Sequence, residues 1–165
     1  MTQELRSRSL DPFQRARIFA RIPASRPIHP DFRKHLARTD DALIELFTDL
    51  RAFMLKLHPD SNELLYHTHV LTAVFSVSEK LSDACCMLPI YTAHVNLGFN
   101  KRTLLVDPHA LLKGTGNLIR HIPVSQARDY RNAKVTASVK AAFDFAVNDL
   151  DAPRTARAKT ISKIK

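Results

Sequence analysis

Glycine is confined to one short stretch of this 165-residue chain. Its only three glycines, Gly98, Gly114 and Gly116, all fall within 19 residues. Glycine is required where φ is positive or where another group approaches the backbone closely. The rest of the chain must therefore form its helices, strands and turns without glycine, and residues 98–116 are predicted to form one region of specialised backbone.

The size and composition of the chain indicate one globular domain. A length of 165 residues with 45% hydrophobic residues is enough to bury a core. No run of about 18 apolar residues occurs, which argues against a membrane-spanning helix, and the first residues lack the apolar segment of a secretory signal. The adjacent Cys85 and Cys86 are expected to be reduced and buried. We therefore expect a cytoplasmic protein with no membrane contact.

The net charge of +9 comes entirely from the two ends of the chain. Residues 1–38 carry nine Lys or Arg against three acids, and residues 151–165 carry five against one. Residues 39–150 carry eleven against twelve and are therefore close to neutral. Basic ends of this kind bind phosphate groups electrostatically or serve only solubility, and both interpretations stay open.

Three regions are predicted along the chain. Residues 1–38 are expected to form an irregular arm, because three prolines in its second half interrupt any long helix. Within the arm, Phe32 and Leu36 are spaced to pack one short helix onto the domain. Residues 39–150 form the folded domain, and 151–165 form a basic C-terminal tail.

Two long helices are predicted from apolar residues that recur at i, i+3, i+4 and i+7. The first is expected at 41–57 with Thr39 or Asp40 as its N-cap, and the second at 133–148 with Asn132 as its N-cap. The apolar stripes that carry these predictions are Leu43, Leu46, Phe47, Leu50, Phe53, Met54 and Leu57 in the first helix, and Val135, Val139, Ala142, Phe143, Ala146 and Leu150 in the second.

Strand patterns lie between these helices. Residues 64–77 are rich in β-branched and aromatic types, with clear alternation over 70–77. Residues 84–91 are almost continuously apolar, and Pro89 within them suggests a bulge or an edge strand. Segments 94–99 and 121–125 alternate again. The order of helix, strands and helix predicts an α+β fold with an antiparallel sheet.

The glycine region is predicted to contain a short helix. Asp107 and Pro108 form a typical helix start, and Gly114 lies where a helix commonly ends with a residue at positive φ. The segment is then expected to turn into the last strand.

The segments H-V-N-L-G-F at 94–99, D-P at 107–108 and L-L-K-G-T-G-N-L-I-R-H-I at 111–122 resemble the YdhG-like domain family. The resemblance covers roughly residues 40–150. It implies a small α+β domain in which helices pack on one face of a curved antiparallel sheet. The family has no agreed activity, and it is sometimes grouped with frataxin-like proteins and labelled an iron chaperone.

One part of the chain departs from that family pattern. Many members carry a G-M-P motif near the first strand, where this sequence reads L-L-Y-H-T-H-V at 64–70. Any function that depends on the G-M-P loop is therefore in doubt for this chain.

Histidines are the most conspicuous candidates for binding chemistry. His67 and His69 are two residues apart, so on a strand they would share one face. Imidazoles in this spacing can bind a metal if a third ligand joins them, and His94 and His121 are the candidates. The alternative, which we expect, is a hydrogen-bonded polar pocket with no metal, in which Asn96 takes part.

Two further hypotheses concern ions. The backbone N–H groups beside Thr115, with Arg120 and His121, are a candidate site for a small anion, although no phosphate-loop pattern is present. For iron, Asp41, Glu45 and Asp49 form one acidic row at i, i+4 and i+8. Because these are only three carboxylates on a basic protein, we expect them to form a solvated helix face rather than an iron site.

Taken together, these patterns predict a binding protein rather than an enzyme. No nucleophile elbow, Ser-His-Asp spacing or pair of catalytic carboxylates stands out, and no cofactor is indicated. The expected ligand is a small molecule or a protein partner, bound on the polar face of the sheet. The residues expected there are His67, His69, His94, Asn96, Thr115, Arg120 and His121. Iron binding in the chaperone sense and nucleic-acid association through the basic ends are the two alternatives.

Overall fold

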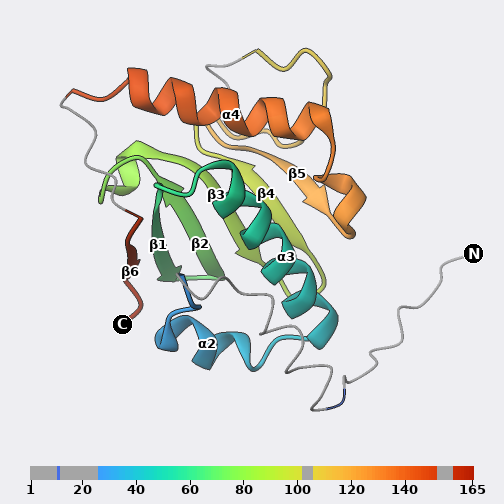
Figure 1. The fold of residues 1–165 in the computed structure, drawn as a ribbon. Coiled ribbons are helices and arrows are strands. Elements are labelled where there is room, and N and C mark those ends of the chain that lie inside the picture. Colours follow the sequence, from blue (N-terminus) through green and yellow to red (C-terminus); the bar gives the residue numbers. More distant parts are fainter. Residues whose placement is uncertain (1–10, 12–25, 102–105, 152–157) are drawn as a thin grey trace, which may run out of the picture.

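The computed structural model describes residues 11, 26–101, 106–151 and 158–165 (Figure 1). These residues form a layer of helices against a layer of strands. The elements in chain order are α2 (Pro30–Leu36), α3 (Asp41–Leu57), β1 (Asn62–His67), β2 (Leu71–Ser76), β3 (Ala84–Ile90), β4 (Val95–Phe99), β5 (Arg120–Val124), α4 (Ala133–Asn148) and β6 (Thr160–Ser162), with short 3₁₀ turns at Leu81–Asp83 and Ala127–Asp129.

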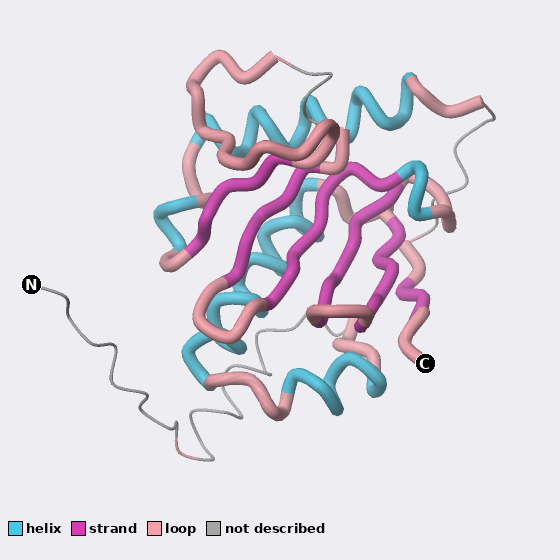
Figure 2. Tube along the Cα trace, turned by 180° about the vertical axis from the view of Figure 1, so that it is seen from behind, coloured by secondary structure: helices cyan, strands magenta, loops and turns pink. Residues whose placement is uncertain are grey.

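The strands form one six-stranded sheet in the order β5-β4-β3-β2-β1-β6. Strands β1 to β4 each pair antiparallel with the next strand along the chain, whereas β6 pairs parallel with β1. The helices α3 and α4 lie on the same face of the sheet, which the two opposite views make clear (Figures 1 and 2). The predicted α+β fold with helices on one face is therefore confirmed, and β6 makes the sheet mixed rather than purely antiparallel.

Both long helices begin and end where the apolar period predicts. The side chain of Asp40 accepts the N–H of Ala42 at 2.9 Å, and that of Asn132 accepts the N–H of Val135 at 2.9 Å. Each cap satisfies a backbone donor that has no partner within the first turn of its helix. The capping side chain and the apolar period therefore agree on the residue at which each helix begins.

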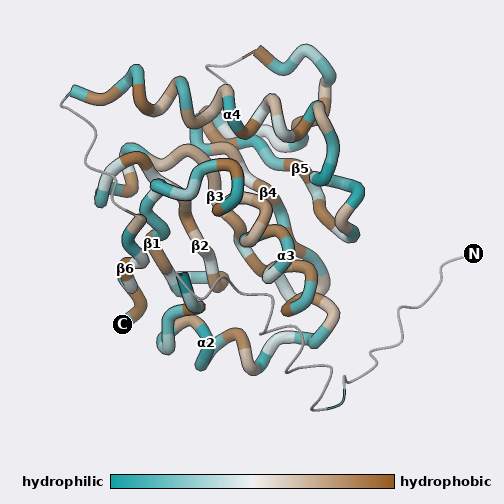
Figure 3. The backbone as a smooth tube through the Cα atoms, in the orientation of Figure 1, coloured by the Kyte–Doolittle hydropathy of each residue, from teal (hydrophilic) through white to brown (hydrophobic). Residues whose placement is uncertain are grey.

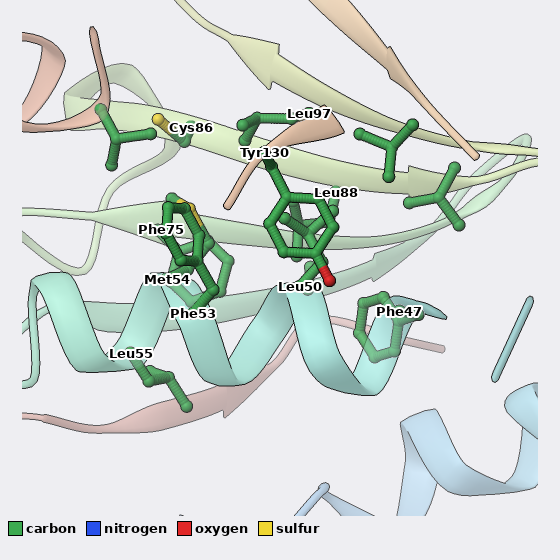
Figure 4. Close-up of a cluster of buried hydrophobic side chains, with 14 of the residues drawn as sticks. Phe47, Leu50, Phe53, Met54, Leu55, Phe75, Cys86, Leu88, Leu97 and Tyr130 are labelled. Carbon is green, nitrogen blue, oxygen red and sulfur yellow. The ribbon is translucent and has the colours of Figure 1, made fainter. Parts of the chain in front are cut away.

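The core lies between α3 and the central strands. Figure 4 shows Leu50 and Met54 of α3 pointing toward Phe75 of β2 and Leu88 of β3, with the ring of Tyr130 beside them. All five side chains are fully buried. Burying an aliphatic side chain of this size stabilises a fold by about 2 kcal/mol, so this contact is a main source of stability.

The short helix α2 packs on the domain as the spacing of its apolar residues predicts. Phe32 and Leu36 are each 1% exposed, and the ring of Phe32 stacks on that of Phe47 with centroids 5.2 Å apart. Most of the remainder of the predicted arm lies outside the described residues.

A buried ion pair joins the helix layer to the sheet. The Nε and Nη2 atoms of Arg51 donate to the two carboxylate oxygens of Glu63 at 2.7 Å each, and both residues are at most 2% exposed. Arg26 Nη2 donates to the carbonyl of Lys159 at 3.1 Å, and Thr160 Oγ1 donates to Glu63 at 3.1 Å. Arg26 Nη2 also lies 4.0 Å from Glu63 Oε2, so Arg26 and Thr160, from opposite ends of the fold in sequence, both approach this carboxylate.

The segment predicted as a tail at 151–165 contributes β6. Ile161 packs on the small cluster that contains Leu64, and Ile164 packs on the main core. Figure 3 shows hydrophobic residues within this short stretch and along the central strands. The segment was predicted to be a tail because it is basic, and that prediction gave these two isoleucines no place in the fold.

Residues 64–77 do not form one strand. They are divided between β1 and β2, which pair as a hairpin with His67 opposite Leu71. The connecting residues 68–70 include none of the Gly, Pro, Asn or Asp that commonly mark a hairpin turn. The turn therefore left no signal in the sequence.

Pro89 lies in a central strand, so of the two alternatives that it suggested, a bulge or an edge strand, the edge position is wrong. Strand β3 pairs with β2 on one side and with β4 on the other. The pairing with β4 involves Cys86, Met87 and Ile90 and is interrupted at positions 88 and 89. Because Pro89 has no N–H to donate, the sheet tolerates it where this ladder is interrupted.

The helix predicted after Asp107 does not form. The carboxylate of Asp107 instead accepts the N–H groups of Leu111 at 3.2 Å and Leu112 at 3.1 Å, which holds the segment in a turn. Gly114 does have positive φ, at 113°, as predicted. It ends no helix, however, because it directly follows Lys113, which pairs with His121 as an isolated bridge.

Candidate functional site

Three connections of the fold meet at one end of the sheet and line an open hollow. They are the link from α2 to α3, the turn from β1 to β2 and the turn from β3 to β4. The hollow has a volume of about 780 Å³, which is in the range of small-molecule sites. Its polar side chains include His35, Arg38, His67, His69, Tyr91 and His94.

The strand register explains why the two turns lie together. Leu71, which begins β2, pairs with Ile90, which ends β3. Both hairpins therefore turn at the same end of the sheet. The second turn is closed by a hydrogen bond of 2.8 Å from the N–H of Tyr91 to the carbonyl of His94.

Two pairs of contacting rings line the hollow. The imidazoles of His35 and His67 have centroids 4.1 Å apart, and the rings of Tyr91 and His94 are stacked 4.6 Å apart at 15°. Partial burial and, next, the neighbouring His67 imidazole lower the pKa of His35, and the charge of nearby Arg38 adds to this effect. His35 thus holds its proton less readily than a solvated histidine does.

Hydrogen-bond donors outnumber carboxylates at the hollow. Arg38 is exposed there, and the imidazoles add further N–H groups. Among the described residues that line the hollow, the only carboxylate is that of Asp40, which already accepts the N–H of Ala42 as the cap of α3. The surface therefore suits an acceptor-rich, negatively charged ligand.

The seven residues predicted to form one polar face are divided between separate places. His67, His69 and His94 do meet at the hollow, although His67 ends β1 and His69 lies in the turn, so the two do not share a strand face. His121 pairs with Gly98, four residues along β4 from His94. At about 3.3 Å per residue that separation is roughly 13 Å, too far for one small site.

Asn96, Thr115 and Arg120 also lie away from the hollow. Asn96 is 8% exposed within β4, and Thr115 is exposed in the loop before β5. Arg120 Nη1 donates to the carbonyls of Gly116 and of Ile119, so this nitrogen closes its own loop. The single polar face expected from the sequence is therefore wrong, because the register separates its members along the strands.

Three residues of the hollow were missed by the sequence reasoning. His35 and Arg38 fall in the segment that was predicted as an arm, and Tyr91 lies in a turn between strands. One signal was present for His35, which precedes the core residue Leu36 and follows Phe32 by three positions. That spacing places it at the border of the buried face of α2.

The acidic row on α3 is engaged in other contacts. Asp41 is 5% exposed, and Asp49 accepts Arg131 Nε at 2.9 Å and Nη2 at 2.8 Å as well as the hydroxyl of Tyr130. Glu45 alone of the three is exposed. In the part of the chain that the structure describes, no group of three or more His, Cys, Asp or Glu is arranged to hold a metal ion.

No family model, curated protein or solved structure matches this chain. Of the helices within the described residues, none has both the length and the apolar character needed to cross a membrane.

Proposed function

We propose that this chain is a binding protein that holds a small anionic molecule in the histidine hollow, defined by His35, Arg38, His67, His69, Tyr91 and His94. One observation carries the proposal: four imidazoles and a guanidinium, from α2 and its link to α3, from the end of β1 and its turn, and from the β3–β4 turn, line a single hollow in which Asp40 is the only carboxylate among the described residues. Even a neutral imidazole offers one N–H donor, so these side chains present several donors beside the permanent charge of Arg38.

The chemistry of the hollow suits a carboxylate or a phosphate. Guanidinium and imidazolium groups form short, charge-assisted hydrogen bonds to such anions, and Arg38 offers a planar pair of donors. The stacked rings of Tyr91 and His94 present a flat surface for an unsaturated part of the ligand. The side chains of Leu71 and Ile90 add an apolar contribution to the lining.

Titration with inorganic phosphate and with phenyl phosphate tests the proposal. Histidine resonances of the hollow should shift on addition of either anion, and Arg38→Ala should weaken binding about tenfold, the usual effect of one charge-assisted contact. The resonance of His109 is the internal control, since His109 is exposed and does not line the hollow. Equal shifts at His109, or none at the hollow, would contradict the proposal.

Titration with ferrous iron and with zinc separates this function from the chaperone alternative. Stoichiometric metal binding that is abolished in His94→Ala would favour metal handling over anion binding. The anion proposal expects no such stoichiometric site.

A further inference from the structure

Basic residues from the two ends of the described chain lie side by side. Ser162 Oγ donates to the carboxylate of Asp31 in α2 at 2.6 Å, and the N–H of Lys163 donates to the carbonyl of Leu65 at 2.8 Å. Both opposite views show the last residues next to α2 (Figures 1 and 2). The sequence separates these segments by more than a hundred residues, and only the fold joins them.

The cations of these segments form a basic stripe, defined here as Arg33, Lys34, Arg38, Lys163 and Lys165. All five are exposed. Three carboxylates lie near these cations: Asp31, which accepts Ser162 Oγ, Asp40, which caps α3, and Glu79, which pairs with Lys159 and interacts electrostatically with Lys163. Even with all three ionised, the five cations leave a net positive charge among these described side chains.

The stripe leads into the histidine hollow. Arg38 belongs to both, and the stacked pair of Tyr91 and His94 lines the same hollow from the turn between β3 and β4. Arg33 and Lys34 lie within α2, and Arg38 follows the last residue of the helix by two positions, so these cations continue from the helix to the hollow. A linear polyanion with a flat terminal group fits this arrangement.

We propose that the stripe and the hollow together bind single-stranded nucleic acid, with phosphates along the stripe and one base stacked on Tyr91 and His94. The inference rests on the proposed function, since the nucleotide in the hollow is its anionic ligand. Proteins that hold single strands without sequence preference combine a basic path with aromatic rings in this way.

Two observations favour a single strand over a membrane or a duplex. An unpaired base can enter a ring-lined hollow, whereas a duplex keeps its bases stacked and a lipid headgroup offers none. The exposed apolar residues Val106, Leu118 and Ile119 precede β5, whose first residue pairs with Phe99 at the opposite end of β4 from the hollow. These three apolar residues, which could contact a membrane, therefore lie away from the basic stripe.

Fluorescence anisotropy with a labelled short oligothymidylate tests the inference. The double variant Lys34→Glu/Lys163→Glu should weaken binding at least tenfold and should reduce the salt slope by about 0.7 for each phosphate that is no longer neutralised. The matched control is Lys134→Glu/Lys140→Glu, which reverses two exposed charges on α4. Tyr91→Ala should weaken binding about tenfold by removing a stacking surface.

Comparison with thymidine monophosphate, a duplex of equal length and phosphatidylserine vesicles completes the test. If the monophosphate shifts the histidine signals but the oligothymidylate binds no tighter, the inference fails and the proposed function stands. If neither binds and phosphate shifts no histidine, the proposed function fails. Tighter binding to the vesicles or to the duplex would overturn the inference. An affinity for the oligothymidylate that is unchanged in Tyr91→Ala would overturn it as well. The midpoints of urea denaturation check that each variant is folded.

Discussion

The imidazole of His35, in the last turn of α2, lies against the imidazole of His67, the last residue of β1, with ring centroids 4.1 Å apart. This contact brings together two residues that a sequence-based view assigns to an arm and to a strand. Partial burial and, next, this neighbouring imidazole lower the pKa of His35. An anion bound in the hollow, as proposed above, would favour the protonated form of His35 and so oppose this effect.

His67→Ala is expected to raise the pKa of His35 toward its ordinary value of 6.5, because both the neighbouring ring and part of the burial are removed. The imidazole proton shifts followed through a pH titration measure this directly. His109→Ala is the control and should leave His35 unchanged. An unaltered pKa in His67→Ala would mean that His67 has no part in the effect.

Stability should depend on pH in a direction set by the same residue. The unfolded chain protonates His35 near pH 6.5, whereas the folded state resists protonation until lower pH. The free energy of unfolding should therefore fall as pH falls from 6.5 through the lowered pKa of His35. Urea denaturation across this range should show a smaller fall in His67→Ala, and a fall of equal size would contradict the coupling.

Glu63→Gln should destabilise the fold by about 3–5 kcal/mol, because it leaves the buried guanidinium of Arg51 without its counter-charge. Urea unfolding measures the loss. Glu79→Gln is a matched control, since Glu79 pairs with Lys159 at 2.8 Å on the surface and should change stability little. Similar losses in the two variants would show that burial of the Arg51–Glu63 pair is not decisive.

Gly114→Ala should cost about 1 kcal/mol or more, because a side chain at a φ of 113° is strained. Gly116→Ala serves as the comparison: Gly116 is not at positive φ, and its added Cβ would lie 3.4 Å from the carbonyl oxygen of Ile119. Thermal unfolding of both variants decides the matter. A smaller loss in Gly114→Ala than in Gly116→Ala would show that backbone strain does not govern this loop.

Gly98→Ala should cost about 1–3 kcal/mol through overpacking, since the new Cβ would lie 2.7 Å from Cγ of Met87 on the paired strand. Met87→Ala in the same chain should relieve the clash. A double-mutant cycle by urea denaturation should therefore show a favourable coupling between the two changes. Strict additivity would indicate that Met87 moves aside without cost.

The sequence by itself determined the two long helices and most of the strands. An apolar period of 3.6 residues and a capping side chain act within one segment, so Asp40 and Asn132 mark helix starts without reference to the rest of the fold. The alternation over β4 and β5 likewise reports which residues face the core. Gly114 also revealed its positive φ, because only glycine adopts it readily.

The tertiary structure alone decided the β1–β2 turn, the parallel addition of β6 and the hollow. Turn residues 68–70 carry no local marker, and β6 joins the sheet by pairing with β1, almost a hundred residues earlier in the chain. The hollow forms because Leu71 pairs with Ile90 and brings two turns beside α2, while the register of β4 and β5 carries His121 away from His94. The positions of these side chains and strands depend on pairing between segments that are distant in the sequence. The local periodicity of apolar residues does not specify which distant segments pair.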